Sequence, residues 1–303
     1  MTPGPNVICD WLDVTYAPDC APWPTINRLL LDAGFDAETS DRTTFLYRHG
    51  RYATVTFGPS RGAMRVSFSG SACAALREHG SWYDLLSELS CVPHRVTRVD
   101  AALDLSVDGA DLVDLMRKRY PSGEVNLMRK AVKTSVVLAT RRDGRETGTW
   151  YAGRMSKARY TARVYDKAWE ALQKRGELLP ARTRIEVTAK GGDSGATLRD
   201  AADPAALFWH LASPALLDAP EGSPVWTPNR DLGWVAPAKH FDPAALLKRR
   251  VESFAMLDAL ALLADELGPH GRDYLLGLLA KRLDAAEGLT AAPSSVSSGR
   301  AAG

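Results

Sequence analysis

The sequence lacks most features that would place it in a common class. Its four cysteines form no C-x-x-C pair and have no histidine at a zinc-binding spacing, so we expect reduced thiols. No uncharged apolar run of about 18 residues occurs, which argues against a membrane-spanning helix. The first residues lack a basic segment followed by an apolar one. We therefore expect no signal peptide and a cytoplasmic protein without a membrane partner.

ATP hydrolysis and a strong overall charge are not indicated either. The P-loop pattern G-x-x-x-x-G-K-[S/T] is absent. The formal net charge is only +2, so any attraction to nucleic acid must come from a local patch. Residues 141–167 form such a patch in the sequence, because eight basic residues there stand against three acidic ones.

The order of expected elements predicts an α+β fold with a mostly antiparallel sheet and flanking helices. Strand-like segments separated by glycine turns alternate irregularly with helical patterns, without a regular strand–helix repeat. One helix is expected to have Ser71 as its cap and Gly80 as its end. We expect strands at 8–16, 44–50, 51–58, 63–70, 94–107, 134–140, 149–154, 160–167 and 182–190, and helices at 25–34, 71–80 and 109–120.

The chain is expected to divide into three parts. Residues 1–200 hold the expected sheet and form the first domain. Residues 201–288 contain a loop rich in Pro and Trp and then two helices, the first with Asp242 as cap and Gly268 as end. Residues 289–303 show no periodicity and are expected to be disordered.

Three of the expected strands separate apolar from polar side chains by alternation, since successive residues of a strand face opposite sides. These strands lie within 98–105, 161–167 and 183–190. If they share one sheet, their polar side chains form one face. Its members are Arg98, Asp100, Asp104, Arg163, Tyr165, Lys167, Arg184, Glu186, Thr188 and Lys190.

Two interpretations fit this polar face. It could be a solvated face with cross-strand ion pairs, as antiparallel sheets often have. It could also be a site that cleaves phosphodiesters. A tyrosine hydroxyl has a reference pKa near 10, so as a nucleophile Tyr165 would need nearby positive charge or a base. Phosphoryl transfer also needs charge neutralisation by Lys, Arg or a metal held on carboxylates. Composition alone does not decide between the two.

Several segments resemble the replication-initiation proteins of rolling-circle plasmids and filamentous phages, the Rep_trans type. In order they are "RVDAALDL", "TWYAGRMSKARYTARVYDKAWE" and "RIEVTAK", preceded by "CDWLDVTY" and "SFSGSACAAL". The resemblance covers about residues 8 to 190. Its most specific part is Y-x-G-R-x-S followed by R-x-Y-D-K-x-x-E.

This resemblance implies a metal-dependent enzyme that nicks and rejoins DNA. Such proteins bind a double-strand origin, cut one strand with a tyrosine and stay attached to the 5′ phosphate while the 3′ hydroxyl primes synthesis. Tyr165 matches the nucleophile, and Lys167 could stabilise the phenolate or the pentavalent phosphate. Tyr160 falls on the opposite strand face, and we assign it to the core or to a supporting contact.

The expected metal is Mg²⁺ or Mn²⁺. The six histidines are isolated, so the His-hydrophobic-His site of other initiators is absent and ligation falls to carboxylates. The candidates are Asp100, Asp104 and Glu186. At about 3.3 Å per residue, Asp100 and Asp104 on a regular strand stand roughly 13 Å apart. We therefore favour Glu186 with Asp100 and leave Asp104 as a ligand or an ion-pair partner. Glu170 could add a carboxylate or form a salt bridge at a helix start.

The resemblance also implies DNA partners, both double-strand origin DNA and single-stranded DNA. Basic and polar residues near the motif could bind the DNA backbone or be ordinary surface charge. They are Arg154, Ser156, Lys157, Arg159 and Arg163. A host helicase would separate the strands, since no ATPase motif is present. A homodimer could form through helices within 243–288, although packing within the chain explains those helices equally well.

Other functions also fit the sequence. A relaxase or transposase would use the same chemistry on a different DNA site. A DNA-binding regulator could keep the fold without the chemistry, although Tyr165, Lys167, Asp100 and Glu186 are all present. A tyrosine recombinase is disfavoured, because no Arg…H-x-x-R set precedes Tyr165.

Overall fold

Antiparallel strands dominate the computed structural model, which describes residues 6–18, 21–39, 44–60, 62–120, 124–127, 130–154, 158–213 and 216–229. The strands there are β1 (Val7–Tyr16), β2 (Asp36–Thr39), β3 (Phe45–His49), β4 (Ala53–Ser60), β5 (Ala63–Phe68), β6 (His94–Leu105), β7 (Glu124–Leu127), β8 (Lys130–Thr140), β9 (Glu146–Ala152), β10 (Tyr160–Asp166) and β11 (Thr183–Lys190). The helices are α1 (Trp23–Asp32), α2 (Gly70–His79), α3 (Trp82–Ser90), α4 (Gly109–Arg119), α5 (Lys167–Arg175), α6 (Leu198–Ala202) and α7 (Ala205–Ala212).

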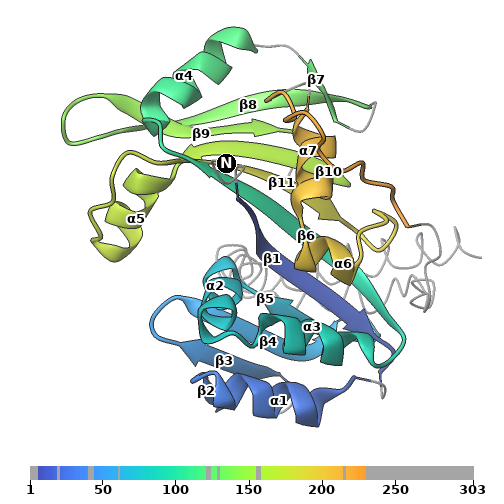
Figure 1. Ribbon diagram of the computed structural model, residues 1–303. Coiled ribbons are helices and arrows are strands. Elements are labelled where there is room, and N and C mark those ends of the chain that lie inside the picture. Colours follow the sequence, from blue (N-terminus) through green and yellow to red (C-terminus); the bar gives the residue numbers. More distant parts are fainter. Residues whose placement is uncertain are drawn as a thin grey trace, which may run out of the picture. The chain divides into compact units, whose positions relative to one another are not determined.

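The strands form one sheet in the order β2-β3-β4-β5-β1-β6-β11-β10-β9-β8-β7 (Figure 1). Its centre is built from segments far apart in the sequence, because β6 lies between β1 and β11. Every pairing of neighbouring strands is antiparallel. The predicted α+β fold with an antiparallel sheet is confirmed.

The predicted helices need one correction and one addition. The cap of α2 is Ser69 rather than Ser71, since the Ser69 side chain accepts a hydrogen bond from the Ala72 amide. The end at Gly80 is confirmed, with φ of 85°. Helix α3 was not predicted, although Leu85, Leu86 and Leu89 at helical spacing form its buried face.

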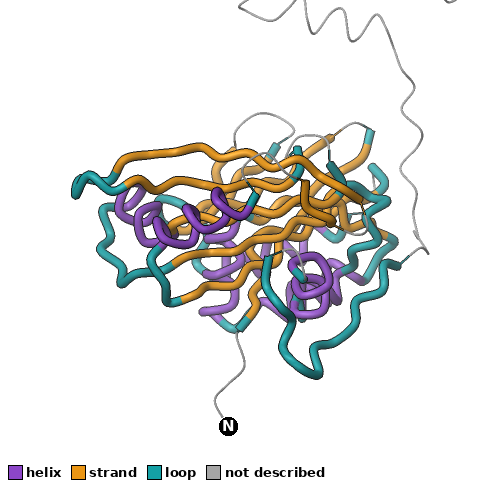
Figure 2. Tube along the Cα trace, turned by 90° about the horizontal axis from the view of Figure 1, so that it is seen from above, coloured by secondary structure: helices purple, strands orange, loops and turns teal. Residues whose placement is uncertain are grey.

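One face of the sheet is apolar and carries most of the helices (Figure 2). Helix α7 contacts β1, β6, β10 and β11, α4 contacts β9 to β11, and α2 contacts β1 and β4. Trp150, Val164 and Ile185 are buried on this face. Tyr160 lies there too, buried, and its hydroxyl donates a hydrogen bond of 2.7 Å to the Ser194 carbonyl. Tyr160 therefore belongs to the core.

The packed structure continues past residue 200, where the first domain was predicted to end. Buried residues of α7 lie in the same core as the sheet, and Trp226 is buried and donates a hydrogen bond of 2.8 Å to Asp200. All described residues belong to one compact unit. The helices and tail predicted beyond residue 242 lie outside the described residues. None of the described helices has the length and apolarity needed to span a bilayer.

Candidate active site

The register of three central strands assembles the predicted polar face. Tyr165 of β10 is opposite Arg184 of β11, which in turn is opposite Asp104 of β6. Arg163 is opposite Glu186. This face is not a solvated one, because Glu186 is 0% exposed, Asp100 1% and Tyr165 7%. Burying so many charged groups costs free energy unless they form ion pairs or bind a metal ion.

Asp10 is a further carboxylate of this face that the sequence did not reveal. The β1–β6 register shifts between Cys9 and Trp11, so Asp10 is an extra residue there. Such a bulge turns a side chain away from its alternating position. The close packing at Asp10 also requires a glycine, since a Cβ on Gly70 would come within 2.7 Å of the Asp10 carboxylate.

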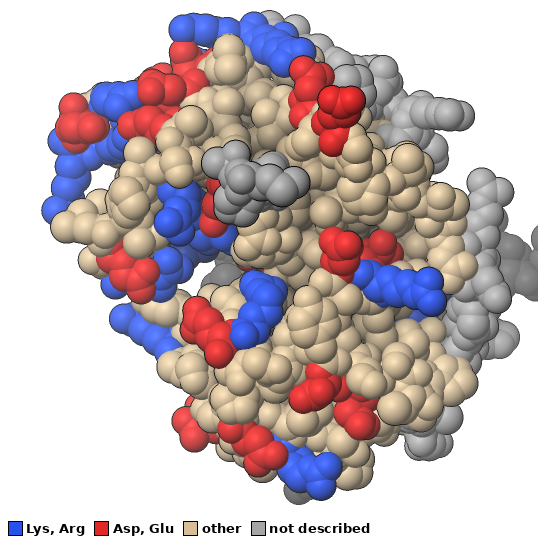
Figure 3. Space-filling view, viewed as in Figure 1, with Lys and Arg blue, Asp and Glu red and all other residues tan. Residues whose placement is uncertain are grey.

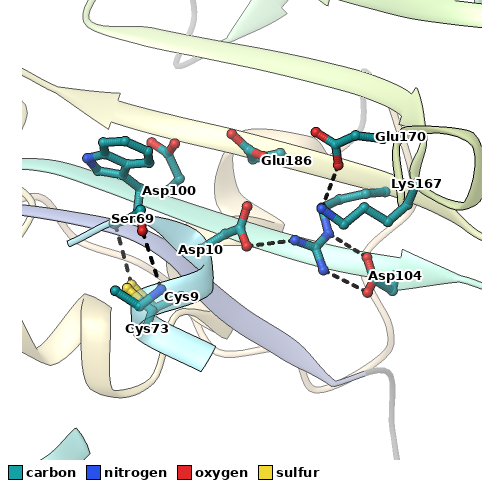
Figure 4. A network of polar contacts seen from close by, with 12 residues as sticks. Cys9, Asp10, Ser69, Cys73, Asp100, Asp104, Lys167, Glu170 and Glu186 are labelled. Atoms are coloured by element: carbon teal, nitrogen blue, oxygen red, sulfur yellow. Dashed lines mark hydrogen bonds and ion pairs between the residues drawn. The ribbon is translucent and has the colours of Figure 1, made fainter. Parts of the chain in front are cut away.

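Arg184 joins two of the carboxylates. Its guanidinium donates to both oxygens of Asp104, at 2.6 and 2.8 Å, and to Asp10 at 2.6 Å. Of the two roles left open for Asp104, the structure shows the ion pair. In Figure 4, Asp104 lies apart from Asp10, Asp100 and Glu186.

Glu186 has less positive charge around it than its burial demands. Arg163 Nη2 donates to Oε2 at 2.6 Å, and Oε1 lies 2.5 Å from the same nitrogen without hydrogen-bond geometry. The buried Oε1 thus has no hydrogen-bond donor among the described residues. Burial first, and then the charges of Asp100 and Asp10, raise the pKa of Glu186 to about 8 against the opposing effect of Arg163. A cation bound beside Glu186 would relieve this repulsion.

The donor chemistry of this face fits a hard divalent cation. Among the described residues no group of three or more His, Cys, Asp or Glu side chains converges as a complete ligand set. Mg²⁺ in nucleotide-processing sites usually takes only one or two carboxylates, with water and phosphate oxygens completing its shell. Glu186 and Asp100 could supply such a pair. Arginines already hold both of the aspartates, because Arg98 donates to both oxygens of Asp100 and Arg184 to both oxygens of Asp104. Asp100 is favoured over Asp104 because its charge acts on Glu186, and a cation bound there would share the Asp100 carboxylate with Arg98.

Tyr165 is enclosed by cations and lies near a carboxylate. The Arg163 guanidinium lies 5.2 Å and the Lys167 ammonium 5.6 Å from the ring centroid. Burial and the charge of Glu186 raise the pKa of the phenol, while Arg184 and Arg163 lower it. The net direction is upward, so the phenol is neutral near pH 7 in this state. Its activation requires a proton acceptor or additional positive charge.

Lys167 reaches Tyr165 from a helix rather than from a strand. The predicted strand ends at Asp166, and Lys167 is the first residue of α5. Lys167 contacts Glu170 at 2.6 Å, and Glu170 contacts Lys174 at 2.7 Å. Burial opposes the ionised carboxylate, yet the two lysines lower the pKa of Glu170 to about 2. The salt-bridge interpretation of Glu170 is therefore the one that the structure shows.

The residue after the tyrosine is fixed by a network outside the polar face. Asp166 caps α5 by accepting from the Trp169 amide at 2.9 Å, and it also accepts from the Thr147 hydroxyl. Arg141, in the turn between β8 and β9, donates to Asp166 at 2.9 Å and to Asp108 at 2.7 Å. The hairpin turn thereby holds the end of β10 and the beginnings of α4 and α5 together.

We expect Arg141→Met to lower the free energy of unfolding by roughly 3 kcal/mol, because Asp166 would stay buried without its charged partner. Hydrogen bonding to Arg141 lowers the pKa of Asp108 from 3.8 to about 2. A carboxyl group whose pKa is lower in the folded state stabilises the fold when the pH is above its pKa in the unfolded state. That stability is lost as the pH falls through its pKa in the folded state. The part of the variant's stability loss that comes from Asp108 should therefore become smaller as the pH falls from about 4 to about 2.

Urea unfolding of wild type and variant across this pH range would measure the effect. Arg142→Met is the matched control, since Arg142 is the exposed neighbour and should change stability by less than about 0.5 kcal/mol. Equal stability of Arg141→Met and wild type at pH 7 would contradict the role given to this network.

Tyr165 opens onto a cavity of about 820 Å³. One wall comes from β10, β11 and α5, and the other from β1, α2 and the turn between β3 and β4. Within the described ranges, four carboxylates line it: Asp10, Glu78, Glu170 and Glu177. The basic lining residues are Arg51, Arg77, Arg98, Arg163, Lys167, Lys174, Arg175, Arg182 and Arg184. Figure 3 shows a hollow with Lys and Arg side chains around it. Its excess of positive charge suits a polyanion.

The predicted DNA-binding residues have diverse surroundings. Arg163 lines the cavity but is paired with Glu186. Arg159 forms an ion pair with Asp193, and Arg154 is exposed. Ser156 and Lys157 lie outside the described residues. The local excess of basic residues in the sequence is thus partly neutralised by acids from other segments, whereas residues of the cavity wall such as Arg51 and Arg175 were not predicted.

Comparisons with known proteins give a distant likeness of fold. No protein-family model matches the sequence, and a search of curated proteins finds no match. A rolling-circle replication initiator protein from Geobacillus stearothermophilus is similar in structure, with a TM-score of 0.49 and 19% identity, over 69% of this chain and 86% of that one. The di-domain ARO/CYC BexL from the BE-7585A biosynthetic pathway matches with a TM-score of 0.18 and 11% identity, over 65% of this chain and 92% of that one.

Proposed function

We propose that the protein initiates rolling-circle DNA replication by nicking and rejoining one strand through a 5′-phosphotyrosine at Tyr165. One observation carries this proposal. The tyrosine of the R-x-Y-D-K-x-x-E motif lies in the wall of a basic cavity, with Arg163 and Lys167 over its ring. Phosphoryl transfer needs a positioned nucleophile and neutralised charge, and this arrangement supplies both.

The reaction is a transesterification. The Tyr165 oxygen attacks the phosphorus and loses its proton, the bond between phosphorus and the 3′ oxygen breaks, and the 3′ oxygen gains a proton to leave as a hydroxyl. Arg163 and Lys167 would stabilise negative charge on the phosphoryl oxygens. Rejoining reverses these bond changes with the same 3′ hydroxyl or with another. The energy of the phosphodiester is kept in the phosphotyrosine, so no ATP is needed.

Asp100 and Glu186 would hold Mg²⁺ or Mn²⁺ in this proposal. The bound ion would supply positive charge for the phosphate and the leaving oxygen. Arg184 has a separate role, since it fixes Asp104 and Asp10 and lies opposite Tyr165 in the sheet. It is a positioning residue for the tyrosine.

The partners follow from this reaction. Basic residues that line the cavity, among them Arg51, Arg175 and Arg182, would bind the backbone of a single strand. Origin DNA would supply that strand, and a host helicase would separate it from its complement. A homodimer through residues 243–288 would bring a second copy to the origin.

A nicking assay on supercoiled DNA that carries the region around this gene tests the proposal. Wild type with Mg²⁺ or Mn²⁺ should convert the DNA to the open circle and leave protein attached to a 5′ end on a denaturing gel. Nicked product without attached protein would contradict the tyrosine mechanism. Binding without nicking would favour a non-catalytic regulator instead.

A further inference from the structure

Trp11 differs in its surroundings from the tryptophans of the core. Four tryptophans of the described part of the chain are buried there: Trp82, Trp150, Trp209 and Trp226. Trp11 is half-buried and lines the cavity onto which Tyr165 opens. It lies on β1, directly after the bulge at Asp10 and opposite Asp100 of β6.

The indole of Trp11 is held in one orientation before any ligand binds. Its Nε1 donates to Asp13 at 2.7 Å, and the Ser67 hydroxyl donates to the same carboxylate oxygen at 2.5 Å. The Arg98 guanidinium lies 4.4 Å from the centre of the Trp11 ring system. Arg98 is fixed in turn by Asp100, to which its Nε donates at 2.8 Å. A rigid aromatic surface of this kind loses little entropy when it binds a ligand.

A fixed flat apolar surface in a basic cavity fits a ligand that has both negative charge and flat apolar groups. Single-stranded DNA has both, since its phosphates would contact the basic residues and its bases can stack on an aromatic side chain. An arginine on an indole adds a cation–π contribution to such a stack. Inorganic phosphate or an acidic peptide would use the charges and leave the indole unused.

We propose that Trp11, backed by Arg98, stacks on an unpaired base of the DNA strand that Tyr165 cuts. This inference rests on the proposed function and extends it to a base-binding subsite. Trp11 is opposite Asp100, Asp100 is opposite Thr188, and Thr188 is opposite Thr161, four residues before Tyr165. Strand spacings place the two Cα atoms on the order of 20 Å apart. The stacked base is therefore a few nucleotides away from the scissile phosphate.

Binding of a single-stranded probe to the full chain tests the subsite. Tyr165→Phe serves as the parent, so that no cleavage occurs. The probe is a fluorescein-labelled oligothymidylate of about 12 nucleotides, a length within the range of single-strand sites, together with a series in which one abasic residue is moved along it. Anisotropy gives each Kd. Adding Trp11→Leu should weaken binding of the intact probe about tenfold.

The abasic series separates stacking from a structural role. One abasic position should weaken binding to the parent about tenfold and leave binding to the Trp11→Leu variant nearly unchanged. Trp169→Leu is the matched control, because Trp169 is half-buried and lines a different cavity. That variant should keep the parent's response to the abasic positions.

A second measurement leaves Trp11 in place and so does not depend on how a variant folds. A probe with 5-iododeoxyuridine at the sensitive position should crosslink under ultraviolet light to the peptide that contains Trp11. A crosslink only to other peptides would overturn the subsite. An abasic position that weakened binding equally with and without Trp11 would overturn it too. In both cases the binding of DNA to the protein would still hold. If no oligonucleotide bound the parent at all, the subsite and the proposed function would both fall.

Discussion

Tyr165→Phe is expected to abolish the covalent protein–DNA adduct and to lower the nicking rate by a factor on the order of 10⁴ or more. The variant loses only the oxygen that forms the bond to phosphorus. Its ring keeps its contacts with Arg163 and Lys167, so DNA binding should change little. The rate is measured on supercoiled DNA and the adduct on a denaturing gel.

Tyr160→Phe is the matched control, since it also removes a phenolic hydroxyl, but from the other tyrosine of β10. That hydroxyl is bonded to the Ser194 carbonyl in the core, so the change should cost about 1 kcal/mol of stability. Nicking should stay within a few-fold of wild type. Full adduct formation by Tyr165→Phe, or its loss in a folded Tyr160→Phe, would contradict the assignment.

Glu186→Gln is expected to remove the response to Mg²⁺ and Mn²⁺. Glutamine keeps the volume of the side chain, but its amide is a weaker ligand than a carboxylate for a hard cation. Nicking should fall by at least the roughly 100-fold that loss of an outer-shell partner of a metal typically costs. The Mn²⁺-induced rise in Tm gives a readout that does not depend on activity. It should be present in wild type and absent from the variant.

Asp104→Asn is the control for Glu186→Gln. It changes a carboxylate on the same face of the sheet, but one whose oxygens are both bonded to Arg184. This variant should be less stable than wild type and should still show the Mn²⁺-induced rise in Tm. If Asp104→Asn lost that rise while Glu186→Gln kept it, the ion would belong beside Asp104 instead.

Much of the fold followed from local patterns, because alternation and glycine turns are properties of short segments. The same alternation predicted that Tyr165, Arg163, Glu186 and Asp100 share a face. It could not place Asp10, since the β1 bulge there breaks the alternating pattern.

The ion-pair partners of the basic residues were harder to predict than the side of the sheet on which each residue lies. The basic excess of residues 141–167 suggested a DNA-binding patch, yet much of its charge is paired across the fold. Arg141 pairs with Asp108 and Asp166, Arg159 with Asp193, and Arg163 with Glu186. Most of these acids lie outside that stretch, and they meet it through a strand order in which β6 and β11 are neighbours. Net charge over a short window of sequence carries no information about such contacts.

The nucleophile is tested most directly by locating the nucleotide on the protein. Trypsin cleaves after Arg159, Arg163 and Lys167, so it separates the two tyrosines of this strand into peptides 160–163 and 164–167. After nicking and nuclease digestion, mass spectrometry should find the nucleotide on peptide 164–167, which contains Tyr165. A nucleotide on peptide 160–163, or on any other part of the chain, would contradict the account.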